Sequence, residues 1–589
     1  MEQLTRRSCL TIVIWCLSML IQASESTPPN IVLLLADDLG FSDLGAFGSE
    51  VSTPNIDLLA GRGVMFSNYH TAASCAPTRA MLMSGLSSHR AGLGNMPESL
   101  TPELQGIPEY TGHLQLGIPT VADRLKETGY RTYMTGKWHL GKTPETLPSA
   151  RGFDRTFIMA DTGADNWDQR PYLPIYDKSN WYADGKPTTL PDDFYSSKIL
   201  VDKTIEFIDS DSNNSSESPF FAYVAFQAVH IPVQAPKEFT HKYLKTYTSG
   251  WHELRQKRYQ GAIAAGVVAA DLTMIEMNTT QAWDALTREQ QRYEAKSMAV
   301  YAGMIEAMDF HIGRLIAHLK ETGQYDNTLF IFTSDNGAEP SDPLAGNPIS
   351  RYSFRSWMED TGYSTKYETL GEIGSYNTIG PSFASAAVAP LSFYKFFNGE
   401  GGMRVPLIIA GPSVTEVSVI NDAFTFATDL VPTILSTANA QPIEQTEGKS
   451  LVPILRGQAS YVRNETESVG FELGGNMAFF KGDYKIVRNR GPIGDDEWHL
   501  FNIKDDPTES LDLSFEQPTR LNDMKAGYAQ YAIDNGVLEM PASYDQRKQV
   551  GINIVRQRLA ENTPTLALSF GIFLFLIFLG VRYWRARRA

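Results

Sequence analysis

A run of apolar residues from Asn30 to Ala36 strongly constrains how this chain of 589 residues can fold. A strand that is apolar at nearly every position has no face suited to water, and such strands are typical of parallel sheets covered on both sides. Similar strand patterns recur, and helical patterns separate them: strands at 130–135, 220–226, 328–333 and 405–410, helices at 121–126 and 299–320. This alternation predicts an α/β fold, a mainly parallel sheet with helices on both faces.

After about residue 460 the pattern changes to short strands and turns. Strand-like segments occur at 478–480, 484–487 and 499–502, and a helical pattern follows at 521–533. We expect a small antiparallel sheet with one helix, packed on the main domain. The predicted boundaries are 25–460 for the main α/β domain, 461–540 for a C-terminal α+β subdomain and 541–563 for a polar stalk.

The segment between residues 340 and 394 is rich in Gly, Ser, Tyr and Pro. A loop of this length in a compact domain is usually functional, and we expect this one to form a wall of a substrate pocket. Its aromatic side chains either stack on rings of a substrate or pack the loop itself: Tyr352, Phe354, Trp357, Tyr363, Tyr367 and Tyr376.

The two ends of the chain indicate export and a membrane anchor. Residues 1–24 combine two arginines, an apolar stretch and small residues, which is the pattern of a signal peptide, with an uncleaved N-terminal anchor as the alternative. Residues 564–583 are long and apolar enough to span a bilayer, and the basic tail at 584–589 favours a single-pass transmembrane helix over a buried core helix. The domain between them is expected in the periplasm or the extracellular space.

Composition excludes several classes of function. The formal net charge is −16, which argues against a nucleic-acid partner because neutralising phosphates requires a basic face. Cys9 and Cys16 lie in the predicted signal peptide, so the mature chain keeps Cys75 as its single thiol. One thiol excludes an intramolecular disulfide and a cysteine-based zinc site, and it leaves Cys75 either as a small buried residue or as a residue with a special role.

Two of the predicted strands end in acidic residues. Asp37 and Asp38 follow the first strand, and Asp335 and Asn336 come just after the strand at 328–333. Because ligands bind beyond the carboxyl ends of parallel strands, neighbouring strands would bring three carboxylates and an amide oxygen together. Such a cluster needs a cation, and hard oxygen ligands favour Ca²⁺ or Mg²⁺. The alternative is that each pair caps a following turn or helix.

Cys75 begins the string Cys75-Ala-Pro-Thr-Arg79 at the start of a predicted helix. The string resembles the Cys-x-Pro-Ser/Thr-Arg signature of the type I sulfatases, and the similarity runs from Asn30 to about residue 515, closest to the bacterial arylsulfatases. Thr78 stands where serine is commonest in that signature. The resemblance implies an alkaline-phosphatase-like fold, and a formylglycine-generating maturase that oxidises Cys75 to Cα-formylglycine, whose aldehyde hydrate is the nucleophile.

The resemblance also implies a calcium site, with Mg²⁺ as the second choice. Arg79 corresponds to the arginine that holds the hydrate. The residues that match the family's calcium ligands are Asp37, Asp38, Asp335 and Asn336, together with the modified Cys75.

Four further residues match catalytic positions of that family. In the string Gly136-Lys-Trp-His-Leu-Gly141, Lys137 matches a sulfate-binding lysine and His139 a histidine that contacts the hydrate. His230 matches the histidine at the leaving group, and Lys395 a second sulfate-binding lysine. These residue types suit the chemistry, because a departing sulfate ester needs cations around its sulfuryl oxygens and a proton donor at the leaving oxygen.

The sequence therefore predicts a sulfuric ester hydrolase of the arylsulfatase type, membrane-anchored and extracytoplasmic. It would release inorganic sulfate and an alcohol or phenol from a sulfate ester substrate. One alternative is a phosphonate or phosphodiester hydrolase with the same nucleophile. Another is an inactive descendant that binds sulfated glycans.

Overall fold

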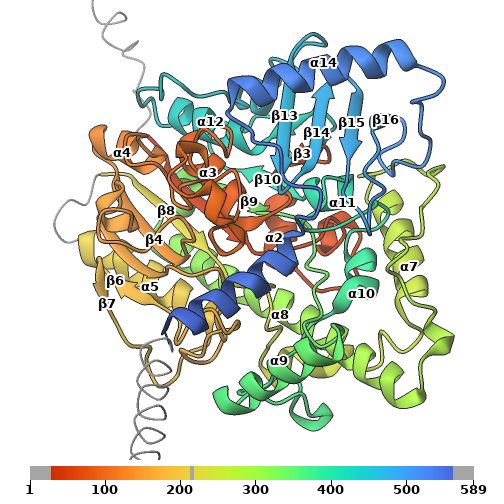
Figure 1. Cartoon of the computed structure of the whole chain (residues 1–589). Helices are drawn as coiled ribbons and strands as arrows, with labels where there is room; N and C mark the ends of the chain where they lie inside the picture. Colours follow the sequence, from red (N-terminus) through yellow and green to blue (C-terminus); the bar gives the residue numbers. More distant parts are fainter. Residues whose placement is uncertain (1–27, 213–217, 562–589) are drawn as a thin grey trace, which may run out of the picture.

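The computed structural model describes residues 28–212 and 218–561 (Figure 1). The predicted signal peptide, the predicted transmembrane helix at 564–583 and the basic tail at 584–589 lie outside the described residues. Among the residues that are described, no helix combines the length and apolar character needed to cross a membrane.

A ten-stranded sheet forms the centre of the main domain, in the order β11-β2-β10-β9-β1-β8-β4-β5-β6-β7. Its five central parallel strands are β9 (Thr328–Ser334), β1 (Asn30–Ala36), β8 (Phe220–Ala225), β4 (Arg131–Lys137) and β5 (Arg155–Met159). The outer strands are β11 (Val419–Asn421), β2 (Gly63–Phe66), β10 (Leu407–Ala410), β6 (Trp181–Ala183) and β7 (Lys186–Pro187). β10 pairs antiparallel with β9 and β2, and β6 pairs antiparallel with β5 and β7. The prediction of a mainly parallel sheet is confirmed.

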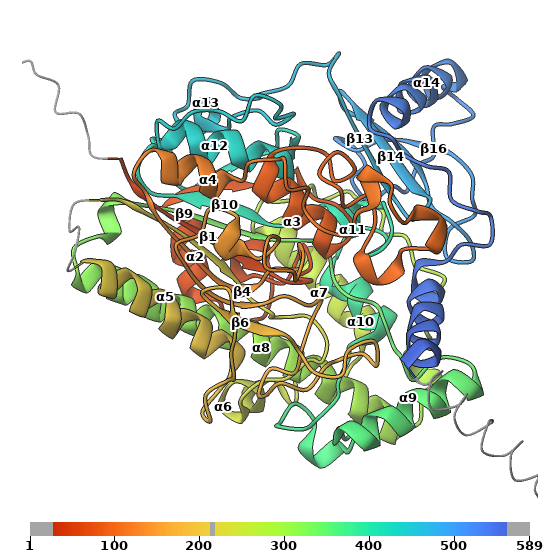
Figure 2. The same ribbon diagram turned by 60° about the vertical axis from the view of Figure 1, so that its left-hand side comes forward.

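β1 is buried along its whole length because helices cover both faces of the sheet. Val32 and Leu34 belong to one apolar cluster, whereas Leu33 and Leu35 belong to a second cluster on the opposite face. Figure 2 shows the two layers, with α5 (Ser196–Ser212) and α8 (Arg288–Glu321) on one face and α3 (Cys75–Ser84), α4 (Val121–Glu127) and α12 (Leu430–Thr437) on the other.

The segment between residues 340 and 394 is not the single long loop that its composition predicts. It contains two helices, α9 (Pro348–Thr361) and α10 (Gly380–Ala387). Asn347 caps the start of α9, where its side chain accepts hydrogen bonds from two backbone N–H groups, and Gly362, with φ of 82°, ends the helix. The Pro and Gly residues that suggested a loop are partly the boundary signals of α9.

A small antiparallel sheet follows the main domain, as predicted. Its strands are β13 (Ser468–Leu473), β14 (Asn476–Lys481), β15 (Tyr484–Arg488) and β16 (His499–Asn502). α14 (Pro518–Asp534) packs on one face through Met524 and Tyr528 against Phe479 and Ile486. Residues of the other face, such as Phe480, join the core of the main domain. The two sheets therefore share one apolar layer.

Residues 546–561, inside the predicted stalk, form a helix that hydrogen-bonds to the main domain. Asn553 Nδ2 donates to the backbone carbonyls of Glu98 and Leu100, each at 2.9 Å. Gln546 Nε2 donates to Asn95 Oδ1, also at 2.9 Å. Up to residue 561, this segment is thus held against the folded body.

Gly136 in β4 lies very close to the backbone of the neighbouring strand β8. Its φ is 100°, and a Cβ at this position would lie 1.8 Å from the carbonyl oxygen of Ala225 on β8. Gly129 also has a positive φ, 86°, but a Cβ there would meet no described atom within 4 Å. We expect Gly129→Ala to lower the free energy of unfolding by about 1–2 kcal/mol through backbone strain alone. Gly136→Ala adds a clash with β8 and should cost roughly 2–5 kcal/mol in total.

The measurement is urea unfolding of both variants and the parent protein, followed by circular dichroism. Equal losses for the two variants would contradict the close approach of β4 and β8 at Gly136.

Candidate active site

The acidic residues meet because β1 and β9 are parallel neighbours. Ala36 pairs with Ser334, so Asp37 and Asp335 leave the sheet at the same edge, and the Asp335 N–H donates to the Ala36 carbonyl at 3.2 Å. The Asp38 N–H donates to Asp335 Oδ1 at 3.1 Å. The residues that the sequence singled out at the two strand ends, three Asp and one Asn, therefore form one buried cluster.

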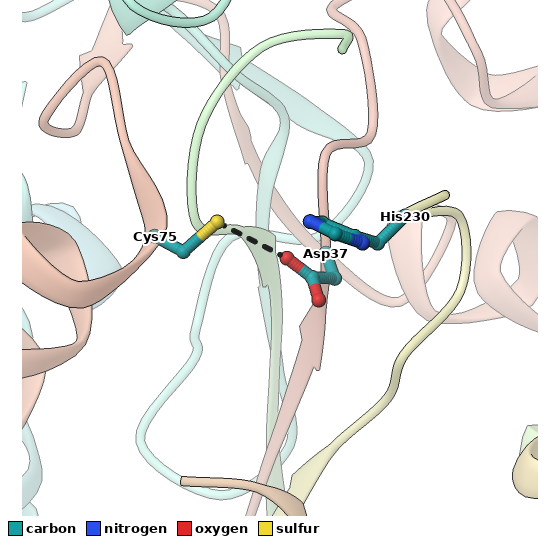
Figure 3. A group of neighbouring side chains, drawn as sticks. All are labelled: Asp37, Cys75 and His230. Carbon is teal, nitrogen blue, oxygen red and sulfur yellow. Dashed lines mark hydrogen bonds between the residues drawn. The ribbon is translucent and has the colours of Figure 1, made fainter. Parts of the chain in front are cut away.

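Cys75 completes this cluster from the other side. It is the first residue of α3, its side chain is fully buried, and its Sγ donates to Asp37 Oδ1 at 3.4 Å and to Asp38 Oδ1 at 3.6 Å. Figure 3 shows the thiol and the His230 ring approaching Asp37 from opposite sides. The start of α3 therefore directs the side chain of Cys75, the one cysteine of the described chain, toward the acidic residues.

The donor set fits a hard cation. One ligand atom from each of Asp37, Asp38, Cys75 and Asp335 lies within 4.8 Å of the others. Asn336 adds an amide oxygen that is buried and has no hydrogen-bond partner among the described residues, while its Nδ2 donates to Asp38 Oδ1 at 2.7 Å. A buried acceptor left unpaired beside three carboxylates is what a bound Ca²⁺ or Mg²⁺ would satisfy.

Two cationic side chains neutralise part of this charge. Lys137, the last residue of β4, donates from Nζ to both oxygens of Asp37 at 2.7 and 2.8 Å. Arg79, one turn after Cys75 in α3, donates from Nε to Asp335 Oδ2 at 2.8 Å and from Nη1 to the Lys137 carbonyl at 2.6 Å. All of these side chains are fully buried.

Burial and neighbouring charges shift the pKa values of Asp37 and Asp335 in opposite directions. Burial raises the pKa of Asp37 to about 8, against the opposing effect of Lys137. Burial also acts on Asp335, but Arg79 and Lys137 outweigh it and hold the pKa of Asp335 below its usual range. Mutual repulsion makes it unfavourable for all of these carboxyl groups to be ionised at once. This is a further property of a cation site.

Lys395 approaches the cluster from the segment before Glu400. Its Nζ donates to Asp38 Oδ2 at 2.9 Å and lies 2.7 Å from Glu339 Oε2. Because Lys395 and Glu339 also line a large cavity, this ion pair stands between the acidic cluster and the space open to a ligand.

The two histidines have different partners. His230 donates from Nδ1 to the Ile231 carbonyl at 2.6 Å, which leaves Nε2 facing the cluster, 3.7 Å from Asp38 Oδ2. His139 follows β4 with a φ of 57°, and its Nε2 lies 3.2 Å from Glu98 Oε2. Burial, together with Lys395 and Lys137, lowers the pKa of His230 well below its usual value.

The structure adds three residues that the sequence did not indicate. Glu98 holds His139 and accepts a hydrogen bond of 2.5 Å from the Tyr176 hydroxyl. Burial opposes its ionisation, but His139 and Tyr176 together lower the pKa of Glu98 to about 2. Glu339 pairs with Lys395. Because Glu339 lies three residues after Asn336, its position in the sequence could have indicated a place near the site. Nothing in the local sequence indicates such a place for Glu98 or Tyr176.

A cavity of about 1970 Å³ opens from this site. Lys395, Glu98, Glu339 and Tyr172 line its inner end. Its outer walls include α9, so the prediction that residues 340–394 contribute to a pocket wall agrees with the position of the cavity.

Comparison with known proteins assigns the chain to a family. A model of the sulfatase family matches residues 29–440, and a model described as N-sulphoglucosamine sulphohydrolase, C-terminal, matches residues 392–525. An uncharacterised sulfatase of Schizosaccharomyces pombe is 36% identical over 550 residues, covering 88% of this chain and 96% of that protein. An arylsulfatase of Klebsiella aerogenes is 35% identical over 437 residues, covering 74% of this chain and 91% of that protein.

Solved structures agree with this assignment at the level of the fold. The structure of Ps i-CgsB in complex with k-i-k-neocarrahexaose has a TM-score of 0.61 and 24% identity, covering 89% of this chain and 96% of that chain. With the family match over the catalytic domain and relatives above 30% identity, the chain belongs to the type I sulfatase family and is a sulfuric ester hydrolase.

Proposed function

We propose that this enzyme hydrolyses sulfate esters with a formylglycine hydrate as nucleophile and one bound Ca²⁺. The hydrate would form from Cys75 after oxidation by a formylglycine-generating maturase, and the products would be inorganic sulfate and an alcohol or phenol. The observation that carries the proposal is the position of Cys75, at the start of α3 with its Sγ directed at Asp37 and Asp38.

Cys75 supplies the nucleophile only after modification. A hydrated aldehyde offers two hydroxyl groups on one carbon, so one can attack sulfur and the other can help to release the sulfate. The chain's own contribution is orientation: α3 fixes the side chain, and Arg79 lies one turn later on the same helix, where its guanidinium can hold a hydroxyl group. Asp37 and Asp38 lie within reach to accept a proton from that group.

Asp37, Asp38, Asp335 and Asn336 would hold the Ca²⁺ together with the modified Cys75 side chain. The unpaired amide oxygen of Asn336 supports this assignment. A ligand set made almost wholly of protein oxygens favours Ca²⁺, since Mg²⁺ usually keeps several waters. The ion would supply positive charge next to the sulfuryl oxygens.

Lys137 and Lys395 would bind the sulfate group. Both ammonium groups are buried, and each now contacts a carboxylate that a cation would neutralise. Lys395 also lines the cavity, so it lies where an ester can reach it. Positive charge in a water-poor site stabilises the charge that develops as the ester bond breaks.

His230 would donate a proton to the leaving oxygen. The Nδ1 hydrogen bond to Ile231 fixes the ring and leaves Nε2 as the atom that faces the substrate. The negative charge of a bound sulfate ester opposes the effects of Lys395 and Lys137 on the ring and favours its protonation. His139, held by Glu98, would contact the hydrate.

Replacement of Cys75 tests the nucleophile. Cys75→Ala is expected to lower kcat for 4-nitrophenyl sulfate by at least about 10³-fold, because the nucleophile is lost, while circular dichroism stays unchanged. Mass spectrometry of the wild-type peptide that contains Cys75, after expression with a maturase, should show a species about 18 Da lighter than the thiol form.

Wild-type protein made without a maturase is the control, since it has the same sequence and should be as inactive as Cys75→Ala. An active Cys75→Ala variant would rule out the proposed mechanism. A converted enzyme that hydrolyses phosphonate monoesters but no sulfate ester would favour the phosphonate hydrolase instead.

Calcium binding can be measured without turnover. Ca²⁺ is expected to raise Tm, since a ligand at 100 times its Kd stabilises the folded state by about 2.7 kcal/mol, and EGTA should reverse the effect. Asn336→Ala removes one ligand and should increase the Ca²⁺ concentration for half of the Tm shift by roughly tenfold or more. Asn421→Ala, on β11, is the matched control. A Tm that does not respond to Ca²⁺ would contradict the assignment.

We also propose that the enzyme is exported and anchored by residues 564–583. Removing residues 564–589 should release it from membranes and leave kcat/KM for 4-nitrophenyl sulfate within twofold, because the site residues all precede this segment. Cell fractionation and kinetics provide the check. Loss of activity in the truncated enzyme would show that the tail does more than anchor.

A further inference from the structure

The cavity above the active site has two helical walls. One is α9, and the other is the helix at 546–561, which hydrogen-bonds to the main domain near Glu98. In Figures 1 and 2 the second helix, in dark blue, lies above the green α9, and residues of both helices line the same cavity. A ligand that extends outward from Lys395 therefore passes between them.

Both walls present large apolar side chains to this space. Ile349 and Tyr352 of α9 are 82% and 76% exposed, and Ile552 and Val555 of the second helix are 45% and 58% exposed. The spacing of three residues in each pair puts both members on one face of their helix. Exposed apolar side chains gathered in one place mark a binding surface, because scattered single ones are the norm elsewhere.

Some of the charged side chains that line the cavity form ion pairs with each other. Arg558 Nη1 lies 2.9 Å from Asp177 Oδ1, and Lys548 Nζ lies 3.7 Å from Asp545 Oδ2. The two walls also carry exposed polar side chains that line the cavity, among them Ser350, Ser353, Asp360 and Arg556, so the apolar contact comes from Ile349, Tyr352, Ile552 and Val555.

We propose that the natural substrate is a sulfate ester whose alcohol carries an extended apolar group, held between α9 and the helix at 546–561. This proposal rests on the proposed function of the site, with the sulfate bound at Lys395. The sequence that follows the second helix agrees with an amphiphilic substrate: residues 562–581 contain no charged residue, so a membrane anchor there would hold the cavity near lipid.

The helix at 546–561 lies beyond both family matches, which end at residues 440 and 525. One of the two apolar walls is therefore built from a part of the chain outside these matches, whereas α9 lies within the first of them. Specificity for an apolar alcohol can then differ from that of relatives that share the catalytic residues.

The test compares two aryl sulfates whose leaving phenols have nearly equal pKa values and differ in the length of one alkyl chain. The full chain, modified at Cys75 and placed in lipid nanodiscs so that no detergent enters the cavity, is assayed with 4-methylphenyl sulfate and 4-hexylphenyl sulfate. A fully buried methylene is worth about fourfold in binding, and an open groove buries only part of the chain. We expect kcat/KM to be at least tenfold higher for the hexyl ester.

Ile552→Ser/Val555→Ser should reduce this ratio at least threefold. The control is Val417→Ser/Ile533→Ser, because these residues are 57% and 74% exposed and do not line the cavity, so the ratio should stay at the wild-type value. Because the control is assayed in the same nanodiscs, partitioning of 4-hexylphenyl sulfate into lipid affects both variants equally.

A wild-type ratio near one would overturn the proposal, as would a ratio unaffected by the Ile552 and Val555 substitutions. A sulfated monosaccharide with a higher kcat/KM than the hexyl ester would also overturn it. In each of these cases, hydrolysis of 4-methylphenyl sulfate would still support the proposed function. If neither aryl ester nor the sugar is hydrolysed by modified enzyme, the proposed function fails and this inference fails with it.

Discussion

The three buried carboxylates at the ends of β1 and β9 impose the main physical constraint on this structure. Asp37, Asp38 and Asp335 are fully buried, and like charges at this distance are unfavourable in a medium of low dielectric constant. Lys137 and Arg79 come from separate elements to offset them. In the proposed mechanism the same cations that neutralise the carboxylates would also bind the sulfate group, so stability and catalysis would depend on one set of charges.

The surrounding sheet holds this cluster in a fixed arrangement. The central strands are buried on both faces, which keeps water out and fixes the positions from which the site residues project. Asp38 and His139 adopt positive φ values of 63° and 57°, which L-residues rarely do. Eight other non-glycine residues of the described chain share this conformation, and at Asp38 and His139 the surrounding packing holds it in place. Rigid placement favours catalysis because the charged groups need little rearrangement during the reaction.

The candidate site and one wall of the cavity come from different parts of the chain. The catalytic cluster is built from residues 37 to 395, within the family match, whereas one wall of the cavity comes from residues 546–561 beyond it. The inner end of the cavity is charged, and its outer walls carry exposed apolar side chains beside polar ones. Such a division allows an enzyme to keep its reaction while the alcohol that it accepts changes.

The fold class and most residues of the candidate site could be predicted from the sequence. Continuous apolar runs such as 30–36 can only be buried between two helical layers, and Asp37 and Asp335 follow such runs directly, so the parallel pairing of β1 and β9 was enough to bring them together. Tertiary structure alone decided the rest. Glu98 reaches His139, and the helix at 546–561 reaches the cavity, through contacts between segments far apart in the chain, and no local pattern encodes such contacts. Residues 340–394 were misread as one loop because Pro and Gly mark the ends of helices as well as turns, and only packing distinguishes the two.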